Sequence, residues 1–136
     1  MAASTFTWIF LAALAAATAT RLWLARRQLR HVREHREKVP DMFAATIPLA
    51  AHQKAADYSA AKAPLAMLDL LIGVAALLVL TLGGALDLIA LQWAKAFAPG
   101  SYAHGVALVT SVVILLSALD LPLAVYRTFV VEARFG

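Results

Sequence analysis

The sequence predicts an all-α integral membrane protein with three transmembrane helices. Hydrophobic residues make up 62% of its 136 residues, charged residues make up 15%, and the mean hydropathy is +0.77, which is too apolar for an ordinary soluble domain of this length. The charges lie beside long apolar runs, whereas nucleic-acid-binding proteins carry them over a polar surface. We therefore expect a lipid bilayer, and no nucleic acid, as a partner. The sequence has no cysteine, which excludes disulfides and cysteine nucleophiles.

Three apolar segments are long enough to cross a bilayer, which takes about 20 helical residues at a rise of about 1.5 Å each. They cover about residues 5–25, 64–88 and 102–126. The first contains no charge before Arg21, whose long side chain can reach the headgroups. Because no Lys or Arg precedes Arg21, the segment lacks the basic start of a cleavable signal peptide. We interpret it as a membrane anchor.

The positions of Lys and Arg predict the orientation in the membrane. None precedes residue 21, nine lie in residues 21–62, one is Lys95, and two follow residue 126. Basic residues are enriched on the cytoplasmic side of membrane proteins. We therefore expect the segment of about residues 26–63 and the C-terminus in the cytoplasm, and the N-terminus and the loop of about residues 87–101 outside.

The first helix is expected to continue past the membrane as a long cytoplasmic extension. Apolar residues recur at helical spacing from Leu22 to Val32, and Pro40 should end the helix. Opposite charges four residues apart predict three stabilising pairs along this extension: Arg30 with Glu34, Arg33 with Glu37, and Glu34 with Lys38.

The remaining connections also have predicted helices. Proline suits a first helical turn, so a helix should start at Pro48 and run into the second span, with a kink at Pro64. Between the second and third spans, the apolar stretch bounded by Gly83-Gly84 and Pro99-Gly100 predicts a short helix at the outer membrane interface. The chain is thus expected to be a single membrane-helix region over residues 1–136.

His31, Glu34 and His35 spell H-x-x-E-H, the order of the residues in inverted zinc peptidases. A metal site is one interpretation, but neighbouring arginines would repel a cation, and zinc needs a third protein ligand, for which Glu132 is the only distant glutamate. The other interpretation is a basic helix end that contacts anionic lipid headgroups. The residues expected to make these contacts are Arg26, Arg27, Arg30 and Arg33.

Lys54, Tyr58 and Lys62 recur every four residues and therefore share one side of a helix. Amphipathic side chains of this kind often form a belt at the membrane interface, which is the simplest interpretation of the pattern.

Asp69 and Asp120 lie within predicted spans, where an ionisable side chain is costly and usually faces a partner or water. Their expected partners are Lys62 for Asp69 and Arg127 for Asp120, or Arg127 for Asp69 across helices. Structural ion pairs and the polar lining of a cavity remain alternative interpretations.

Three separated strings resemble the N-terminal part of the CAAX prenyl protease type of integral-membrane zinc metalloendopeptidase, in its bacterial form. They are RRQLRHVREHREKVP, LAAHQKAADYSAAKAPL and YRTFVVEARFG, in the family's order and joined by apolar spans. The residues that match the family's motifs are Gln53, Lys54, Tyr58 and Lys62 in the second string, and Phe129, Glu132, Arg134, Phe135 and Gly136 in the third.

This resemblance implies a helical membrane barrel around a water-filled chamber, in which zinc bound by a His-Glu-x-x-His helix and a distant glutamate cleaves peptide bonds. That motif occurs nowhere in the 136 residues, so the resemblance assigns them no catalytic, zinc-binding or cofactor-binding residue. We expect them to be inactive alone. Zinc, peptide substrate, the catalytic part and the remaining membrane helices are expected only in the complete protein.

The function that the resemblance implies is therefore a scaffold, in which these residues form part of the chamber wall in the bacterial cytoplasmic membrane. The alternative is a stand-alone small membrane protein whose basic helix binds anionic lipid or a partner protein.

Overall fold

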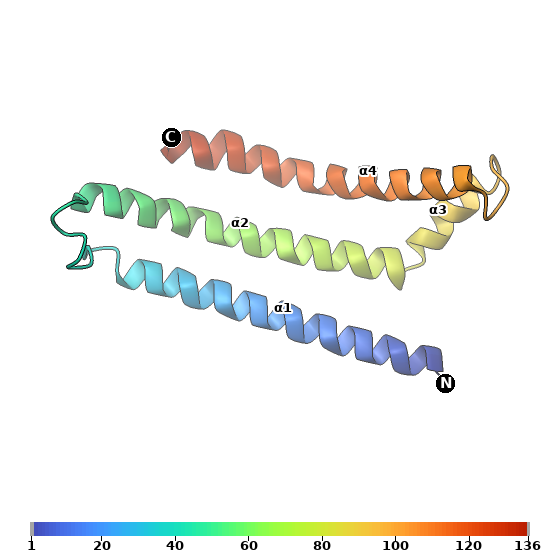
Figure 1. Ribbon diagram of the computed structural model, residues 1–136, viewed down its shortest axis with the longest axis horizontal. Coiled ribbons are helices and arrows are strands. Elements are labelled where there is room, and N and C mark those ends of the chain that lie inside the picture. Colours follow the sequence, from blue (N-terminus) through green and yellow to red (C-terminus); the bar gives the residue numbers. More distant parts are fainter. Residues whose placement is uncertain (1, 136) are drawn as a thin grey trace. The chain divides into compact units, whose positions relative to one another are not determined.

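The computed structural model describes residues 2–135, with side chains from residue 4 onward, and all regular structure in this range is helical. The elements are α1 (Ala2–Glu34), α2 (Leu49–Thr81), α3 (Ala85–Trp93), α4 (Tyr102–Tyr126), a π-helix (Arg127–Glu132) and α5 (Ala133–Phe135) (Figure 1). Three helical stretches of the described residues are long and apolar enough to cross a membrane: Ser4–Glu34, Leu49–Thr81 and Tyr102–Phe135. The predicted all-α class with three such helices is confirmed.

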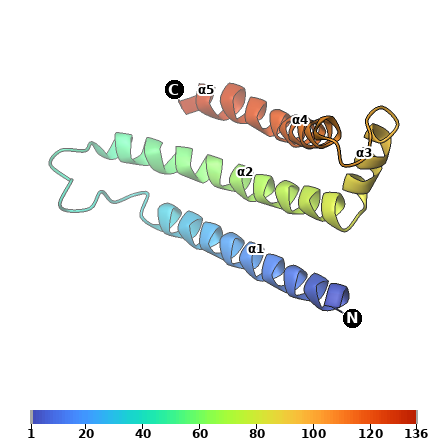
Figure 2. The same cartoon turned by 45° about the vertical axis from the view of Figure 1, so that its right-hand side comes forward.

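The chain divides into two compact units, which we call unit 1 and unit 2. Unit 1 contains residues 1–71 and 126–136, and unit 2 contains residues 72–125. Within unit 1, α1 and the first part of α2 run antiparallel and side by side, and the C-terminal helical segment lies beside the start of α2 (Figures 1 and 2). Gly136, which belongs to the third matching string, lies outside the described residues.

One stripe of α1 is packed and the rest of its surface is exposed. Side chains at spacings of three and four are partly buried, and in the C-terminal half of the helix these are Leu22, Ala25, Leu29 and Val32. This is the apolar stripe predicted from the helical period. The partly buried Arg36 follows Val32 by four residues, so the stripe continues one step beyond the helix.

The end of α1 differs from the prediction. The helix stops at Glu34 and residues 35–37 form turns, so it ends before Pro40. The three predicted i,i+4 pairs do not form; the ion pairs among the described residues are Arg36–Glu37, Arg36–Asp57 and Lys38–Asp41. An exposed i,i+4 pair stabilises a helix by only about 0.2–0.5 kcal/mol, whereas a forked guanidinium–carboxylate contact is stronger. Glu37 contacts Arg36 and Gln53 instead of Arg33.

Helix α2 begins and ends at residues of restricted or unusual backbone conformation. It starts directly after Pro48, whose missing N–H costs nothing at a helix start, and it runs through Pro64 without interruption. It ends at Thr81, before the predicted limit near Leu88. Gly84 adopts a φ of 74°, a left-handed conformation that favours glycine. The helix therefore stops at this turn, and Leu88 belongs to α3.

In unit 2, the short predicted helix is present as α3 (Figure 2). Polar bonds join it to α4. The Trp93 indole N–H donates to Ser111 Oγ at 2.9 Å, and His104 Nε2 donates to the Ala90 carbonyl at 3.0 Å. The rings of Trp93 and Phe97 stack with centroids 5.9 Å apart. The position of α3 at a membrane interface stays a prediction.

The π-helix after α4 was not predicted. It covers Arg127–Glu132 and contains Val131, which is buried. A π turn holds more residues than an α turn, so it changes the directions of the side chains that follow, and such turns are frequent at functional sites.

Candidate functional site

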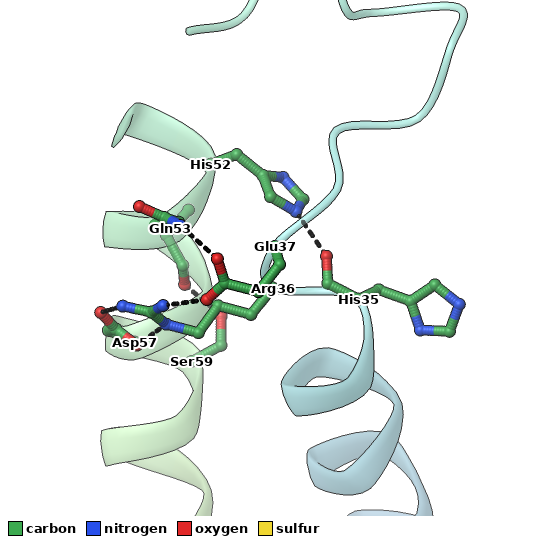
Figure 3. A network of polar contacts seen from close by, with 8 residues as sticks. His35, Arg36, Glu37, His52, Gln53, Asp57 and Ser59 are labelled. Atoms are coloured by element: carbon green, nitrogen blue, oxygen red, sulfur yellow. Dashed lines mark hydrogen bonds and ion pairs between the residues drawn. The ribbon is translucent and has the colours of Figure 1, made fainter. Parts of the chain in front are cut away.

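Four side chains join the end of α1 to the start of α2 in a network that we call the polar junction: Arg36, Glu37, Gln53 and Asp57 (Figure 3). Arg36 makes a forked contact with Asp57, with Nε donating to Oδ1 at 2.7 Å and the second terminal nitrogen donating to Oδ2 at 2.8 Å. Arg36 also donates to Glu37, and the Gln53 amide donates to Glu37 Oε2 at 3.0 Å. The junction fastens the loop that follows α1 to the first turns of α2.

The charges of the polar junction stabilise one another. Asp57 lies on the charged first part of α2, before the apolar stretch that starts near Pro64. Its hydrogen bonds from Arg36 lower the pKa of its carboxyl; partial burial opposes this, and the charges of Arg36 and Arg134 add to it. The hydrogen bonds to Asp57 and then Glu37 raise the pKa of Arg36. Both side chains keep more than a third of their surface exposed, so solvent screens the pair.

Three histidines lie next to the polar junction. His52 Nε2 donates to the His35 carbonyl at 3.0 Å, and His35 Nδ1 donates to the His31 carbonyl at 2.9 Å. Each of these two bonds requires a proton on the ring nitrogen, because a carbonyl oxygen only accepts. The three histidines, with Val32 and Ala56, lie along an open groove of about 570 Å³.

The H-x-x-E-H string does not form a ligand cluster. The rings of His31 and His35 lie with centroids 4.0 Å apart. Nevertheless, no group of three His, Asp or Glu side chains within residues 2–135 is arranged to hold a metal ion. The H-x-x-E-H metal interpretation therefore gains no support from the geometry.

A second groove brings together residues from two of the matching strings. It has a volume of about 440 Å³ and is lined by Ala51, Lys54, Ala55, Tyr58, Glu132 and Phe135. The rings of Tyr58 and Phe135 meet edge to face with centroids 5.6 Å apart. We call it the motif groove, because Lys54, Tyr58 and Glu132 are sequence-predicted candidates. It places a cation, a phenol and a carboxylate around one small space.

Within the predicted belt of Lys54, Tyr58 and Lys62, the side chains of Lys62 and Tyr58 contact each other. Lys62 Nζ donates to the Tyr58 hydroxyl at 2.9 Å and lies 4.7 Å from the centre of its ring. Gln53 is part of the polar junction. Gln53 therefore lies in the polar junction, Lys54 and Tyr58 line the motif groove, and Lys62 contacts Tyr58.

The ion pairs predicted for the aspartates within the spans do not form. Asp69 and Asp120 are exposed, as is Arg127, and none of them takes part in an ion pair in the part of the chain that the structure describes. Lys62 reaches the Tyr58 hydroxyl, four residues away on the same helix, rather than Asp69, which is two turns distant. The carboxylates of Asp69 and Asp120 remain accessible on the surfaces of their helices.

Sequence reasoning missed Arg36, Glu37 and Asp57 as candidates, although one signal pointed to the first of them. Arg36 follows Val32 at the spacing of the packed stripe, so a polar residue at that position needs a partner on the facing helix. The identity of that partner depends on how α1 and α2 are aligned, which no local pattern contains.

The architecture of the described residues is that of an α-helical membrane protein, with apolar helices long enough to span and charged contacts beside their polar ends. The family model for the CAAX prenyl protease N-terminal region, described as having five membrane helices, matches residues 28–136. The chain belongs to this family and is an integral membrane protein. Neither the curated proteins nor the solved structures compared with it include a match.

The match begins at Gln28, so the apolar part of α1 lies before the matched region, whereas the polar junction and the motif groove lie within it. The zinc site implied by the resemblance requires a His-Glu-x-x-His helix, which the sequence does not contain. The residues of this chain therefore do not fit that zinc site.

Proposed function

We propose that these 136 residues are the N-terminal membrane scaffold of a zinc metalloprotease of the CAAX prenyl protease type. They form part of the wall of a water-filled chamber, and the zinc-binding helix is supplied by residues outside this stretch. The family match supports the membrane scaffold. The chamber role depends on the aspartates within the spans.

The observation that carries the proposal is the exposure of Asp69 and Asp120 in helices long and apolar enough to span. A carboxylate inside the bilayer is costly unless it faces water, a cation or another helix. Because neither has an ion-pair partner in residues 2–135, contact with lipid would leave each charge uncompensated. A polar chamber, closed by further helices, satisfies both.

The motif groove supports the same proposal from the polar end of α2. Lys54 on α2 and Glu132 on the π-helix line one space, although they belong to strings far apart in the sequence. We propose that this space lies near the cytoplasmic entrance of the chamber, because its helix precedes an apolar span on the side where Lys and Arg are concentrated.

Cysteine accessibility tests the chamber directly, because the natural sequence contains no cysteine. We expect Asp69→Cys and Asp120→Cys, in membranes from cells that express the whole gene, to react with a small water-soluble methanethiosulfonate. Matched controls are Leu71→Cys and Leu115→Cys, exposed apolar positions on the same helices that lie about 160° and about 140° around the helix axis from Asp69 and Asp120; they should react several-fold more slowly. Aspartate positions no more reactive than their controls would contradict a water-filled chamber.

The coding DNA after residue 136 provides an independent test of the protease assignment. An in-frame His-Glu-x-x-His would support it, and replacing its glutamate by glutamine should abolish zinc-dependent peptidase activity in the membranes. A stop codon followed by unrelated sequence would refute the assignment while leaving the accessibility result to stand by itself.

The orientation is tested with an impermeant thiol reagent on intact cells. Met42 is 87% exposed and Tyr102 is 97% exposed, so a cysteine at either position should be accessible to solvent. We expect Tyr102→Cys to react in intact cells and Met42→Cys to react only after lysis. The reverse pattern would invert the proposed topology.

A further inference from the structure

One side of α1 carries a dense group of basic residues that neither the polar junction nor the motif groove uses. We call it the basic face and define it as Trp23, Arg26, Arg27, Arg30 and Arg33. At about 100° of rotation per residue, these five positions fall within an arc of about 120°. The packed stripe of Leu22, Ala25, Leu29 and Val32 covers a separate, neighbouring arc of about 80°, whose centre lies about 120° around the helix from that of the basic face.

The charge of the basic face is not neutralised by acidic side chains. All four arginines are exposed, and they take part in no ion pair within residues 2–135. Glu34 is the acidic residue on the same side of the helix, and it lies at the far end of the face, where it does not pair with Arg30. The basic face is therefore an exposed, positively charged surface at the end of a helix whose preceding part is apolar.

Helix length and composition lead us to expect the basic face at the depth where a membrane carries its phosphates. Helix α1 has 33 residues and is therefore about 50 Å long at about 1.5 Å per residue, longer than a hydrocarbon core of about 30 Å. The apolar part ends near Ala25, so the following turns leave the hydrocarbon beside the headgroups. This holds for either orientation of the protein in the membrane.

Trp23 and Arg27 form the most specific element of this face. The Arg27 guanidinium lies 5.5 Å from the centre of the Trp23 ring, and Trp23 is 58% exposed. Tryptophan is enriched at membrane interfaces because one part of its ring system is apolar and its N–H is polar. A guanidinium above such a ring keeps its planar donors available for the two oxygens of a phosphate.

We propose that the basic face is a binding site for the headgroup of an anionic phospholipid, which contacts Arg26 and Arg27 most closely. Its acyl chains lie along the apolar part of α1, and its phosphate meets the guanidinium groups. Arg30 and Arg33 lie further along the helix and add longer-range attraction. The site is separate from the proposed scaffold function and does not require a catalytic part.

Quenching of Trp23 fluorescence tests the proposal in the whole chain. The protein is reconstituted in phosphatidylcholine nanodiscs that contain a minor fraction of either brominated phosphatidylglycerol or brominated phosphatidylcholine. The Trp23→Phe variant measures the quenching that arises from the other tryptophans. We expect the Trp23 contribution to be quenched several-fold more by the anionic lipid, and equal quenching by both lipids would overturn the proposal and favour an acidic protein partner.

Two double variants distinguish lipid binding at a local site from a general effect of the protein's net charge. Arg26→Gln with Arg27→Gln should abolish the lipid preference. Lys95→Gln with Arg134→Gln removes the same charge elsewhere, including a guanidinium that lies 5.7 Å from the Phe135 ring, and should retain the preference. Equal loss in both variants would refute a local site. If the first variant does not reconstitute, the comparison of the two lipids in the natural protein still decides the outcome.

Salt and phosphate distinguish a lipid from a free anion. The preference should decrease as NaCl screens the arginines. Inorganic phosphate at the same ionic strength should lower it no further, because the acyl chains anchor the lipid beside Trp23. Full displacement by inorganic phosphate would show a general phosphate site and would overturn the assignment to a phospholipid.

Discussion

Different kinds of polar contact stabilise unit 1 and unit 2, each within itself. In unit 1 the polar junction contains a guanidinium and two carboxylates, which contact one another where α1 has ended and the apolar part of α2 has not begun. In unit 2 the two hydrogen bonds that join α3 to α4 use no carboxylate or guanidinium: the Trp93 indole donates to the Ser111 hydroxyl, and the His104 ring donates to the Ala90 carbonyl.

We expect this difference to reflect the surroundings of the two regions. A charged pair tolerates partial exposure to water, but its desolvation inside a bilayer is costly. Neutral hydrogen bonds are cheaper to bury, and tryptophan and serine both supply them from mainly apolar surfaces. The comparison teaches that a forked charge pair joins α1 to α2 in unit 1, whereas turn geometry and hydrogen bonds without an ion pair shape α3 and α4 in unit 2.

The largest effect is expected at the turn that ends α2. A Cβ atom at Gly83 would lie 2.6 Å from the Val79 carbonyl oxygen and 3.0 Å from its Cα, so Gly83→Ala forces the backbone to shift. Such overpacking costs about 1–3 kcal/mol, measurable by unfolding the detergent-solubilised protein with SDS while following circular dichroism. The matched control is Gly73→Ala, where a Cβ meets nothing within 4 Å; equal destabilisation of both variants would contradict the expected clash.

A smaller effect is expected from the neutral bond in unit 2. Trp93→Phe keeps a ring beside Phe97 but removes the donor to Ser111, which should lower the free energy of unfolding by about 1 kcal/mol. Ser111→Ala and the double variant complete a double-mutant cycle. An interaction energy near zero in that cycle would show that the hydrogen bond does not stabilise unit 2.

The charged contact should contribute less, because solvent screens it. Asp57→Asn removes the carboxylate that accepts from Arg36 and should lower the midpoint of unfolding at pH 7, whereas Asp41→Asn, in an exposed pair at 3.8 Å with Lys38, should leave it unchanged. Equal shifts in the two variants would show that the forked geometry adds nothing.

The pH dependence of the Asp57→Asn effect follows from the lowered pKa of Asp57. A carboxyl whose pKa is lower in the folded state than in the unfolded state stabilises the fold above its ordinary pKa and loses that contribution as the pH falls through the folded-state pKa. The difference in unfolding midpoint between the natural protein and Asp57→Asn should therefore be constant near neutral pH and shrink on acidification below about pH 4. A difference that grows on acidification would contradict the assignment.

The spans show how far local pattern determines this fold. Apolar length predicted a helix over Tyr102–Tyr126, which is α4, although the helical stretch continues through the π-helix to Phe135. Glycine and proline predicted α3 between two turns. The second helix was predicted to end too late. The apolar composition continues past Gly83-Gly84, whereas the helical backbone conformation ends at Thr81. Hydropathy measures where a chain can be buried, and turn conformation decides where a helix stops.

The same contrast applies to the sites. Lys54, Tyr58 and Glu132 were singled out by spacing and by the resemblance, and they line one groove. The pairing of Arg36 with Asp57 was not predicted, since it joins residues 21 positions apart and depends on the alignment of two helices. Two of the three predicted pairs include Glu37 or Lys38, which lie beyond the end of α1; the third, Arg30 with Glu34, lies within the helix and does not form either.

By itself, the sequence determined the helical class, the apolar segments and the family, because these depend on local period, composition and short motifs. Only the tertiary structure decided that Arg36 contacts Asp57 on α2, that Lys62 donates to Tyr58, and that Glu132 of the C-terminal segment lines the same groove as Lys54. The physical reason is that a side-chain contact requires two positions to meet within a few ångströms, and that distance is set by how helices pack and where they end.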